Sequence, residues 1–110
     1  MAIVTQDQIN ALADGFLVGP SEIGLYEVID EVKYELHIDD DREIKRLTLL
    51  AVRRMLERGV RAGCLDGSSQ MVYFEETAPD AIIARLSREW DELGQLPSMG
   101  DHWYFDWLPD

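Results

Sequence analysis

Hydrophobic residues recur at intervals of three and four along most of this chain, a spacing that places them on one side of an α-helix. The pattern predicts four helices, lying within residues 5–19, 22–37, 40–59 and 77–94. Each predicted helix is preceded by a residue whose side chain can accept a hydrogen bond from the first turn: Thr5, Ser21, Asp40 and Thr77. Gln8 and Glu43, three residues beyond two of these caps, complete the spacing of a capping box.

Two other stretches of the chain have the shorter period of β-strands. Residues 60–65 and 71–75 flank the turn-rich sequence 66–69, and together they predict a β-hairpin. The aromatic segment at the end predicts one more strand, with Trp103, Phe105 and Trp107 pointing inward. The predicted fold is a mainly helical α+β domain spanning residues 1–110. It has about four helices and a small antiparallel sheet, made of the hairpin near 60–75 and a C-terminal strand near 102–108.

Composition narrows the class of protein. A chain of 110 residues fits one domain, and an apolar fraction of 46% is enough for a core. Cys64 is the only cysteine, which excludes an intrachain disulfide and favours a reducing compartment. The first ten residues lack the basic and apolar regions of a secretory signal, and no apolar run is long enough for a membrane span. We therefore expect a cytoplasmic protein.

The net charge is −12, from 22 acidic and 10 basic residues. Nucleic acids and anionic membranes require positive surface, so this balance disfavours both as partners and suits the capture of a basic protein. The charge is also segregated along the chain. Residues 1–41 carry ten acids and one base, residues 42–61 two acids and seven bases, and residues 62–110 ten acids and two bases.

The basic segment coincides with the third predicted helix, where Arg42, Arg46 and Arg53 share one sector of the surface. Taken alone, this resembles a nucleic-acid-facing helix, and three helices followed by a hairpin resemble a winged helix. Glu57, four residues after Arg53, and the acidic segments on both sides favour internal neutralisation instead. Both interpretations remain open at this point.

On the second predicted helix, Glu27, Glu31 and Glu35 follow one another at intervals of four. Such carboxylates repel each other by a few tenths of a kcal/mol per pair. The stripe is either a solvated face or a docking surface for a basic partner. At the C-terminus, Tyr104, His102 or an exposed tryptophan is a candidate binding anchor, because aromatic residues are enriched at interface hot spots.

We find no spacing in the sequence that indicates catalysis or metal binding. His37 and His102 lie far apart without a recognised ligand pattern, nothing places either beside Cys64, and no phosphate-binding glycine loop is present. Cys64 is expected to act as a small hydrophobic residue in the hairpin. We expect no catalytic residue, cofactor or metal.

Two segments resemble sequences common in small bacterial proteins: DDREIKRLTLL at 40–50 with MLERG at 55–59, and EWD at 89–91 with GDHWYF at 100–105. Such proteins are similar to immunity proteins of contact-dependent growth inhibition and related polymorphic-toxin systems, and the resemblance spans roughly residues 12–107. It implies neutralisation of a cognate toxin domain, often a nuclease, inside the producing cell. Nuclease domains bind polyanions and tend to be basic, so an acidic inhibitor would gain association rate and specificity.

From charge and resemblance together we expect an immunity protein that works by binding and has no enzymatic activity. The expected partner-binding residues are acidic or aromatic: Glu27, Glu31, Glu35, Asp39, Asp40, Asp41, Glu75, Glu76, Asp101, Tyr104 and Asp106. The alternatives are a winged-helix-like transcriptional regulator using the basic helix 42–58, and a non-catalytic module with another partner. A small enzyme is a third alternative, for which the sequence offers no site.

Overall fold

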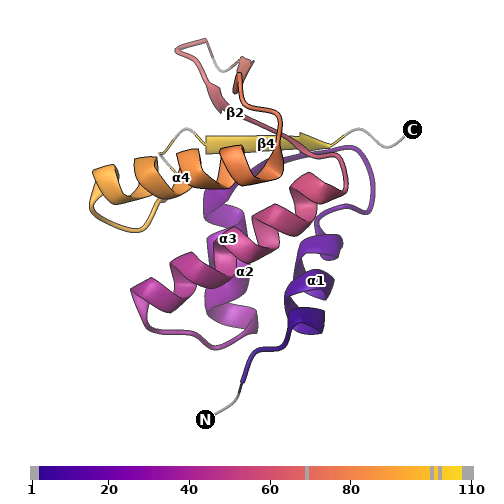
Figure 1. The fold of residues 1–110 in the computed structure, drawn as a ribbon, viewed down its shortest axis with the longest axis vertical. Coiled ribbons are helices and arrows are strands. Elements are labelled where there is room, and N and C mark those ends of the chain that lie inside the picture. The colour runs from indigo at the N-terminus through magenta and orange to yellow at the C-terminus, as the bar shows by residue number, and fades with distance from the viewer. Residues whose placement is uncertain (1–2, 69, 100, 102, 108–110) are drawn as a thin grey trace.

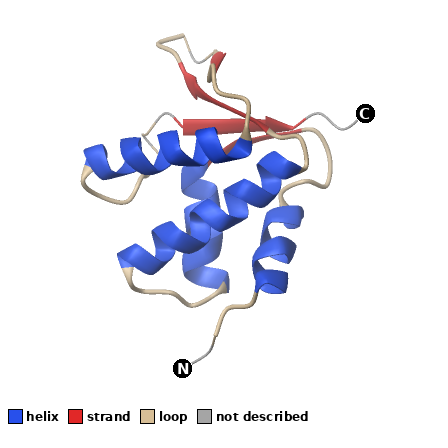
Figure 2. Ribbon diagram, viewed as in Figure 1, coloured by secondary structure: helices blue, strands red, loops and turns tan. Residues whose placement is uncertain are grey.

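The computed structural model describes residues 3–68, 70–99, 101 and 103–107. Its helices are α1 (Gln6–Gly15), α2 (Leu25–Glu35), α3 (Asp41–Glu57) and α4 (Pro79–Leu93). Its strands are β1 (Ser21–Gly24), β2 (Arg61–Leu65), β3 (Met71–Tyr73) and β4 (Trp103–Trp107). The helices lie on one side of a single antiparallel sheet (Figure 1), which confirms the predicted mainly helical α+β fold. Figure 2 shows the two layers by element type.

The sheet has the strand order β1-β4-β2-β3, so the C-terminal strand lies in its interior. β4 pairs with β2 of the hairpin, as expected, and also with β1. In register, Phe105 lies between Ile23 of β1 and Ala62 of β2, and all three face the helices. Because side chains alternate along a strand, Tyr104 and Asp106 face the open side of the sheet. Residues 102 and 108, the outer ends of the predicted strand, lie outside the described residues.

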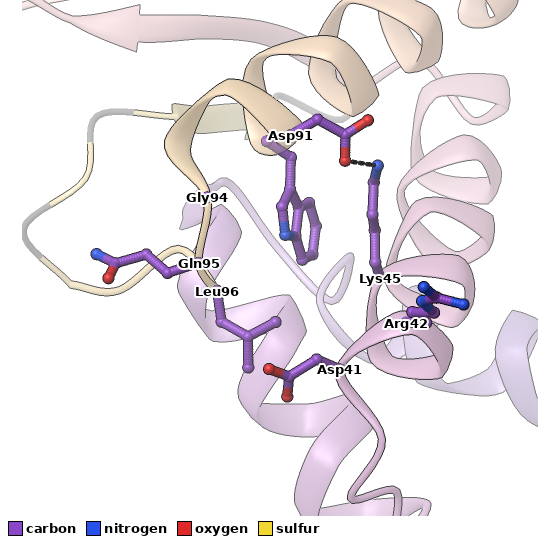
Figure 3. A pocket seen from close by; sticks show the side chains of 8 residues that line it. Asp41, Arg42, Lys45, Asp91, Gly94, Gln95 and Leu96 are labelled. Carbon is purple, nitrogen blue, oxygen red and sulfur yellow. Dashed lines mark hydrogen bonds and ion pairs between the residues drawn. The ribbon is translucent and has the colours of Figure 1, made fainter.

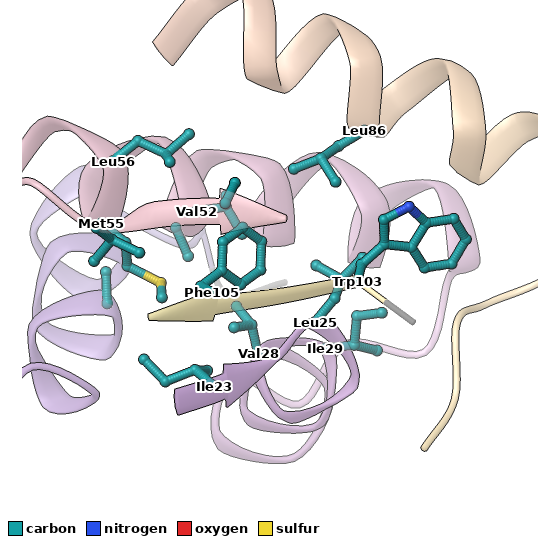
Figure 4. Close-up of a cluster of buried hydrophobic side chains, with 14 of the residues drawn as sticks. Ile23, Leu25, Val28, Ile29, Val52, Met55, Leu56, Leu86, Trp103 and Phe105 are labelled. Atoms are coloured by element: carbon teal, nitrogen blue, oxygen red, sulfur yellow. The ribbon is translucent and has the colours of Figure 1, made fainter. Parts of the chain in front are cut away.

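The hydrophobic core lies between the inner face of the sheet and the helices. Figure 4 shows Phe105 of β4 with Val28 of α2 and Val52 of α3 close to it. Trp103 and Phe105 point inward as predicted, whereas Trp107 is only half-buried. Complete burial of one such side chain contributes about 1.5–3 kcal/mol. The largest fully buried side chains come from all four helices and β4: Phe105, Ile9, Leu25, Ile44, Leu47, Met55, Leu86, Val28, Val32, Val52 and Thr48.

The prediction for residues 21–24 was wrong. Ser21 does not cap a helix that begins at Glu22; instead these residues form β1, and α2 begins three residues later. The backbone of residues 21–24 pairs with β4, a partner eighty or more residues away that no local pattern reveals. Glu27 then marks the true helix start, because its carboxylate accepts a hydrogen bond of 2.6 Å from the Gly24 N–H.

The other helix starts follow the predicted caps more closely. Thr5 and Gln8 form the complete capping box, with hydrogen bonds of 3.2 and 2.8 Å. Asp40 accepts from the Glu43 N–H at 3.1 Å, although the Glu43 side chain does not return the bond because it turns to Arg46. The fourth cap was placed one residue too early: Ala78, not Thr77, precedes α4, with Pro79 as its first residue.

Candidate protein-binding surface

Most basic side chains of α3 form ion pairs with carboxylates, some on α1 and α4 and some on α3 itself. Lys45 bonds Asp91 of α4 at 2.6 Å, and Arg54 and Arg58 share Asp14 of α1 at 3.1 and 3.2 Å. The remaining pairs are Arg46 with Glu43, Arg53 with Glu57 and Asp80, and, just beyond the helix, Arg61 with Asp106. Acidic residues within α3, and others before and after it in sequence, thus neutralise most of its positive charge in the fold.

The pairing also shifts the acid–base equilibria of its members. The hydrogen bond from Arg54, aided by Arg58, lowers the pKa of Asp14 despite an opposing effect of partial desolvation. Arg42 is the one basic residue of α3 that makes no ion pair with the described residues, and it is exposed. Of the positively charged stripe that the sequence suggested on this helix, the Arg42 guanidinium is thus the group left without an ion pair among the described residues.

Five of the predicted partner-binding carboxylates form hydrogen bonds or ion pairs within the chain. Glu27 and Asp40 bond the starts of α2 and α3, and Asp101 accepts from the Ser98 N–H at 2.7 Å. Glu76 pairs with Arg85 at 2.9 Å, and Asp106 with Arg61. These carboxylates add to the acidic field, but their oxygens are already used in holding local structure.

The other predicted carboxylates have no such role. All are exposed and make no ion pair within the described part of the chain: Glu31, Glu35, Asp39, Asp41 and Glu75. Asp30 of α2 and Glu22 of β1 share both properties. Glu22 was not among the predicted binding residues, because residues 21–24 were predicted to begin a helix and form β1 instead. Most of the unpaired acidity therefore lies on α2, its flanks and β1.

Tyrosines adjoin this acidic region on the open side of the sheet. The rings of Tyr26 and Tyr104 meet edge to face, with centroids 6.5 Å apart and planes at 71°. Tyr26 lies over Gly24, where a side chain would collide with its ring. Glu27, followed by partial desolvation, Tyr104 and Asp30, raises the pKa of Tyr26, which places these groups in one neighbourhood.

A second cluster on the same side involves Tyr73 of β3. Its hydroxyl donates to the Asp106 carboxylate, and the Arg61 guanidinium lies 4.2 Å from its ring centroid. The hydrogen bond to Asp106 raises the pKa of Tyr73, with smaller contributions that include Glu22. We call the combined region the tyrosine–carboxylate face: Glu22, Tyr26, Asp30, Tyr73, Tyr104 and Asp106.

The cleft between α3 and α4 has a different character. It measures ≈ 270 Å³ and is lined by Asp41, Arg42, Lys45, Trp90 and Asp91, among others (Figure 3). Lys45 crosses it to bond both Asp91 and the Ser87 carbonyl, at 2.6 and 3.3 Å. Two carboxylates and two bases balance one another there, so the cleft presents no excess charge to a ligand.

Of the residues considered for catalysis, the structure describes Cys64 and His37. Cys64 packs beside the core as expected, and burial, together with Glu89, raises the pKa of its thiol. A nucleophilic thiol requires the opposite shift. His37 is exposed between α2 and α3, and His102 lies outside the described residues. Within the described ranges, no group of three His, Cys, Asp or Glu side chains could hold a metal ion, and no helix could span a membrane.

No protein-family model, curated protein or solved structure matches this chain. The resemblance to immunity proteins therefore rests on the residue pattern alone, and the surface must be interpreted from its own chemistry.

Proposed function

We propose that this chain is a cytoplasmic immunity protein that binds a basic toxin domain and neutralises it without catalysis. The observation that carries the proposal is the division of its carboxylates. Those facing the basic helix α3 are consumed in ion pairs, whereas those on α2 and β1, including Glu22, Asp30, Glu31 and Glu35, are exposed and unpaired.

Exposed like charges on one surface carry a cost in the free protein, since neighbouring carboxylates on a helix repel one another. A basic partner converts that repulsion into attraction and accelerates encounter. The tyrosines add the other requirement of a protein interface, because rigid aromatic side chains are favoured at hot spots. Tyr34 of α2 is 66% exposed beside Glu31 and Glu35. A nuclease toxin would fit this negatively charged surface, because a protein surface that binds a polyanion is positively charged.

The ion pairs of α3 weigh against a transcriptional regulator. A helix that reads DNA must offer its arginines to phosphates and bases. Here Arg46, Arg53, Arg54 and Arg58 are each held by at least one carboxylate. A phosphate would have to displace those partners within a strongly negative protein, so we propose no second function on this helix.

Co-expression tests the proposal. The toxin domain encoded directly upstream of this chain should arrest growth when produced alone, and co-production of this chain should restore growth. The two proteins should co-elute at low salt and separate progressively as salt is raised. Absence of a toxin gene upstream, or failure to protect and co-elute, would refute the immunity role. Duplex DNA binding at physiological salt would support the regulator instead.

A further inference from the structure

The two edges of the sheet differ in how they are protected. β1 forms one edge, follows Pro20, and carries the exposed charge of Glu22. β3 forms the other edge and consists of Met71, Val72 and Tyr73, with no charge, proline or glycine. Natural proteins shield an edge strand with such residues, by keeping it very short as β3 is, or by covering it with another element. The β3 edge lacks the first kind of protection.

The backbone of β3 has hydrogen-bonding groups directed away from the sheet. The bonds from Phe74 N to Ala62 O and from Asp66 N to Gln70 O, at 3.0 and 2.9 Å, fix the phase of the hairpin ladder. Bonded and non-bonded pairs alternate in an antiparallel pair, so Val72 is the β3 residue that bonds β2. The N–H and C=O groups of Met71 and Tyr73 consequently point to the free edge.

The side chains of this strand are also accessible. Val72 and Tyr73 are 54% and 41% exposed, and successive residues of a strand lie on opposite faces. The hairpin extends away from the layer of helices in Figure 1, and β3 is the last strand in the sheet order, with no further strand beside it among the described residues. An added strand would gain main-chain hydrogen bonds and cover apolar surface on both faces.

Charge identifies the kind of strand that fits. A second copy of this chain would bring another net charge of −12, which opposes self-pairing. Glu75, two residues after the strand, is exposed and makes no ion pair with the described residues. Asp66, across the turn at the end of β2, is also exposed and adds negative charge, although its Oδ1 accepts hydrogen bonds from Ser68 and Gln70. We propose that the β3 edge binds an extended segment of a basic protein by β-strand addition, with an uncharged centre and lysine or arginine at its ends. This site stands independently of the immunity role, since any basic partner with such a segment would fit.

A synthetic peptide tests the proposal on the intact chain. The peptide Lys-Thr-Val-Thr-Val-Thr-Lys should bind saturably and slow hydrogen exchange at the Met71 and Tyr73 amides by about tenfold or more. Exchange at Val72, already bonded to β2, should change much less. A peptide with glutamate ends should bind more weakly. A peptide methylated on two neighbouring amide nitrogens should not bind, because it cannot complete the ladder.

Met71→Pro supplies the matched variant. Proline is tolerated at the first residue of an edge strand, and here it removes an N–H that faces outward. The variant should keep its circular dichroism spectrum and lose the lysine peptide, whereas Met71→Leu should keep both. If Met71→Pro unfolds, comparison of the plain and methylated peptides on the wild-type chain still tests the proposal. Equal binding of the plain and methylated peptides, or no protection at Met71 and Tyr73, overturns the proposal. The proposal is also overturned if the chain dimerises and Met71→Pro abolishes the dimer, because the edge would then bind a second copy of the chain.

Discussion

The Arg54 guanidinium of α3 donates two hydrogen bonds to the Asp14 carboxylate of α1, from Nε to Oδ1 at 3.1 Å and from Nη2 to Oδ2 at 3.2 Å. Arg58 reaches the same carboxylate at 3.2 Å. The contact joins the first acidic segment of the sequence to the basic helix. It shows why net charge alone is a poor guide to this surface: part of the acidity serves the fold, and the rest remains for a partner.

Low pH should weaken the ion pair between Asp14 and Arg54. Asp14 has a lowered pKa in the fold, so its contribution to stability is present above its ordinary pKa of 3.8 and is lost as pH falls through the lower folded value. Asp14→Asn should reduce the free energy of unfolding at pH 7 by about 1 kcal/mol or less, because the pair is partly exposed. Urea unfolding should show that the difference from wild type shrinks well below pH 4. The exposed Asp39→Asn serves as control, and an undiminished difference for Asp14→Asn would contradict the assignment.

Thr48 should be replaceable with a gain in stability. Its side chain is fully buried on α3, and its hydroxyl has no hydrogen-bond partner within the described structure. An unsatisfied buried polar group costs about 1–3 kcal/mol. Thr48→Val keeps the shape and should raise the free energy of unfolding by about 1 kcal/mol, whereas Thr48→Ala should lower it by leaving a cavity. Destabilisation by the valine would mean that the hydroxyl is bonded.

Gly63 of β2 should not tolerate a side chain. A Cβ at this position would collide with the Val72 carbonyl, lying 2.9 Å from its carbon and 3.0 Å from Tyr73 Cα. These are backbone atoms that cannot turn aside, so Gly63→Ala should cost about 1–3 kcal/mol in urea unfolding. Gly15→Ala, at the end of α1 with open space around it, should be neutral or slightly stabilising. Equal effects of the two substitutions would contradict the close approach of β3 to β2.

The Tyr73 hydroxyl should ionise at a higher pH than that of an ordinary tyrosine. Its hydrogen bond to Asp106 raises its pKa above the ordinary value of 10.0. The associated stability is therefore present below pH 10 and is lost as pH rises through the higher folded value. In a titration followed by phenolate absorbance, Tyr73→Phe should remove a late-ionising component, and Asp106→Asn should shift that component to lower pH. An unchanged titration curve for Asp106→Asn would exclude the bond.

Local chemistry explains what the sequence could predict. The Thr5–Gln8 box, the Asp40 cap and the alternating strands around residues 66–69 are encoded within a few residues of each other, and the structure confirms them. β1 could not be predicted, because its strand character comes from pairing with distant β4. The same error hid Glu22 and the packing of Tyr26 over Gly24. Ion pairing of α3 was predictable in principle from charge layout, but its partners Asp14 and Asp91 were not, because they depend on tertiary packing.

The most direct test of the binding surface compares two charge reversals of equal size. Glu31 lies on α2 and Glu92 on α4; both are exposed, and neither makes an ion pair with the described residues. Stopped-flow association with the upstream toxin domain at low salt should be slowed roughly tenfold by Glu31→Lys, because like charge opposes encounter. Glu92→Lys should change the rate much less, and high salt should erase the difference. Equal rates for the two variants at low salt would contradict a partner surface on α2.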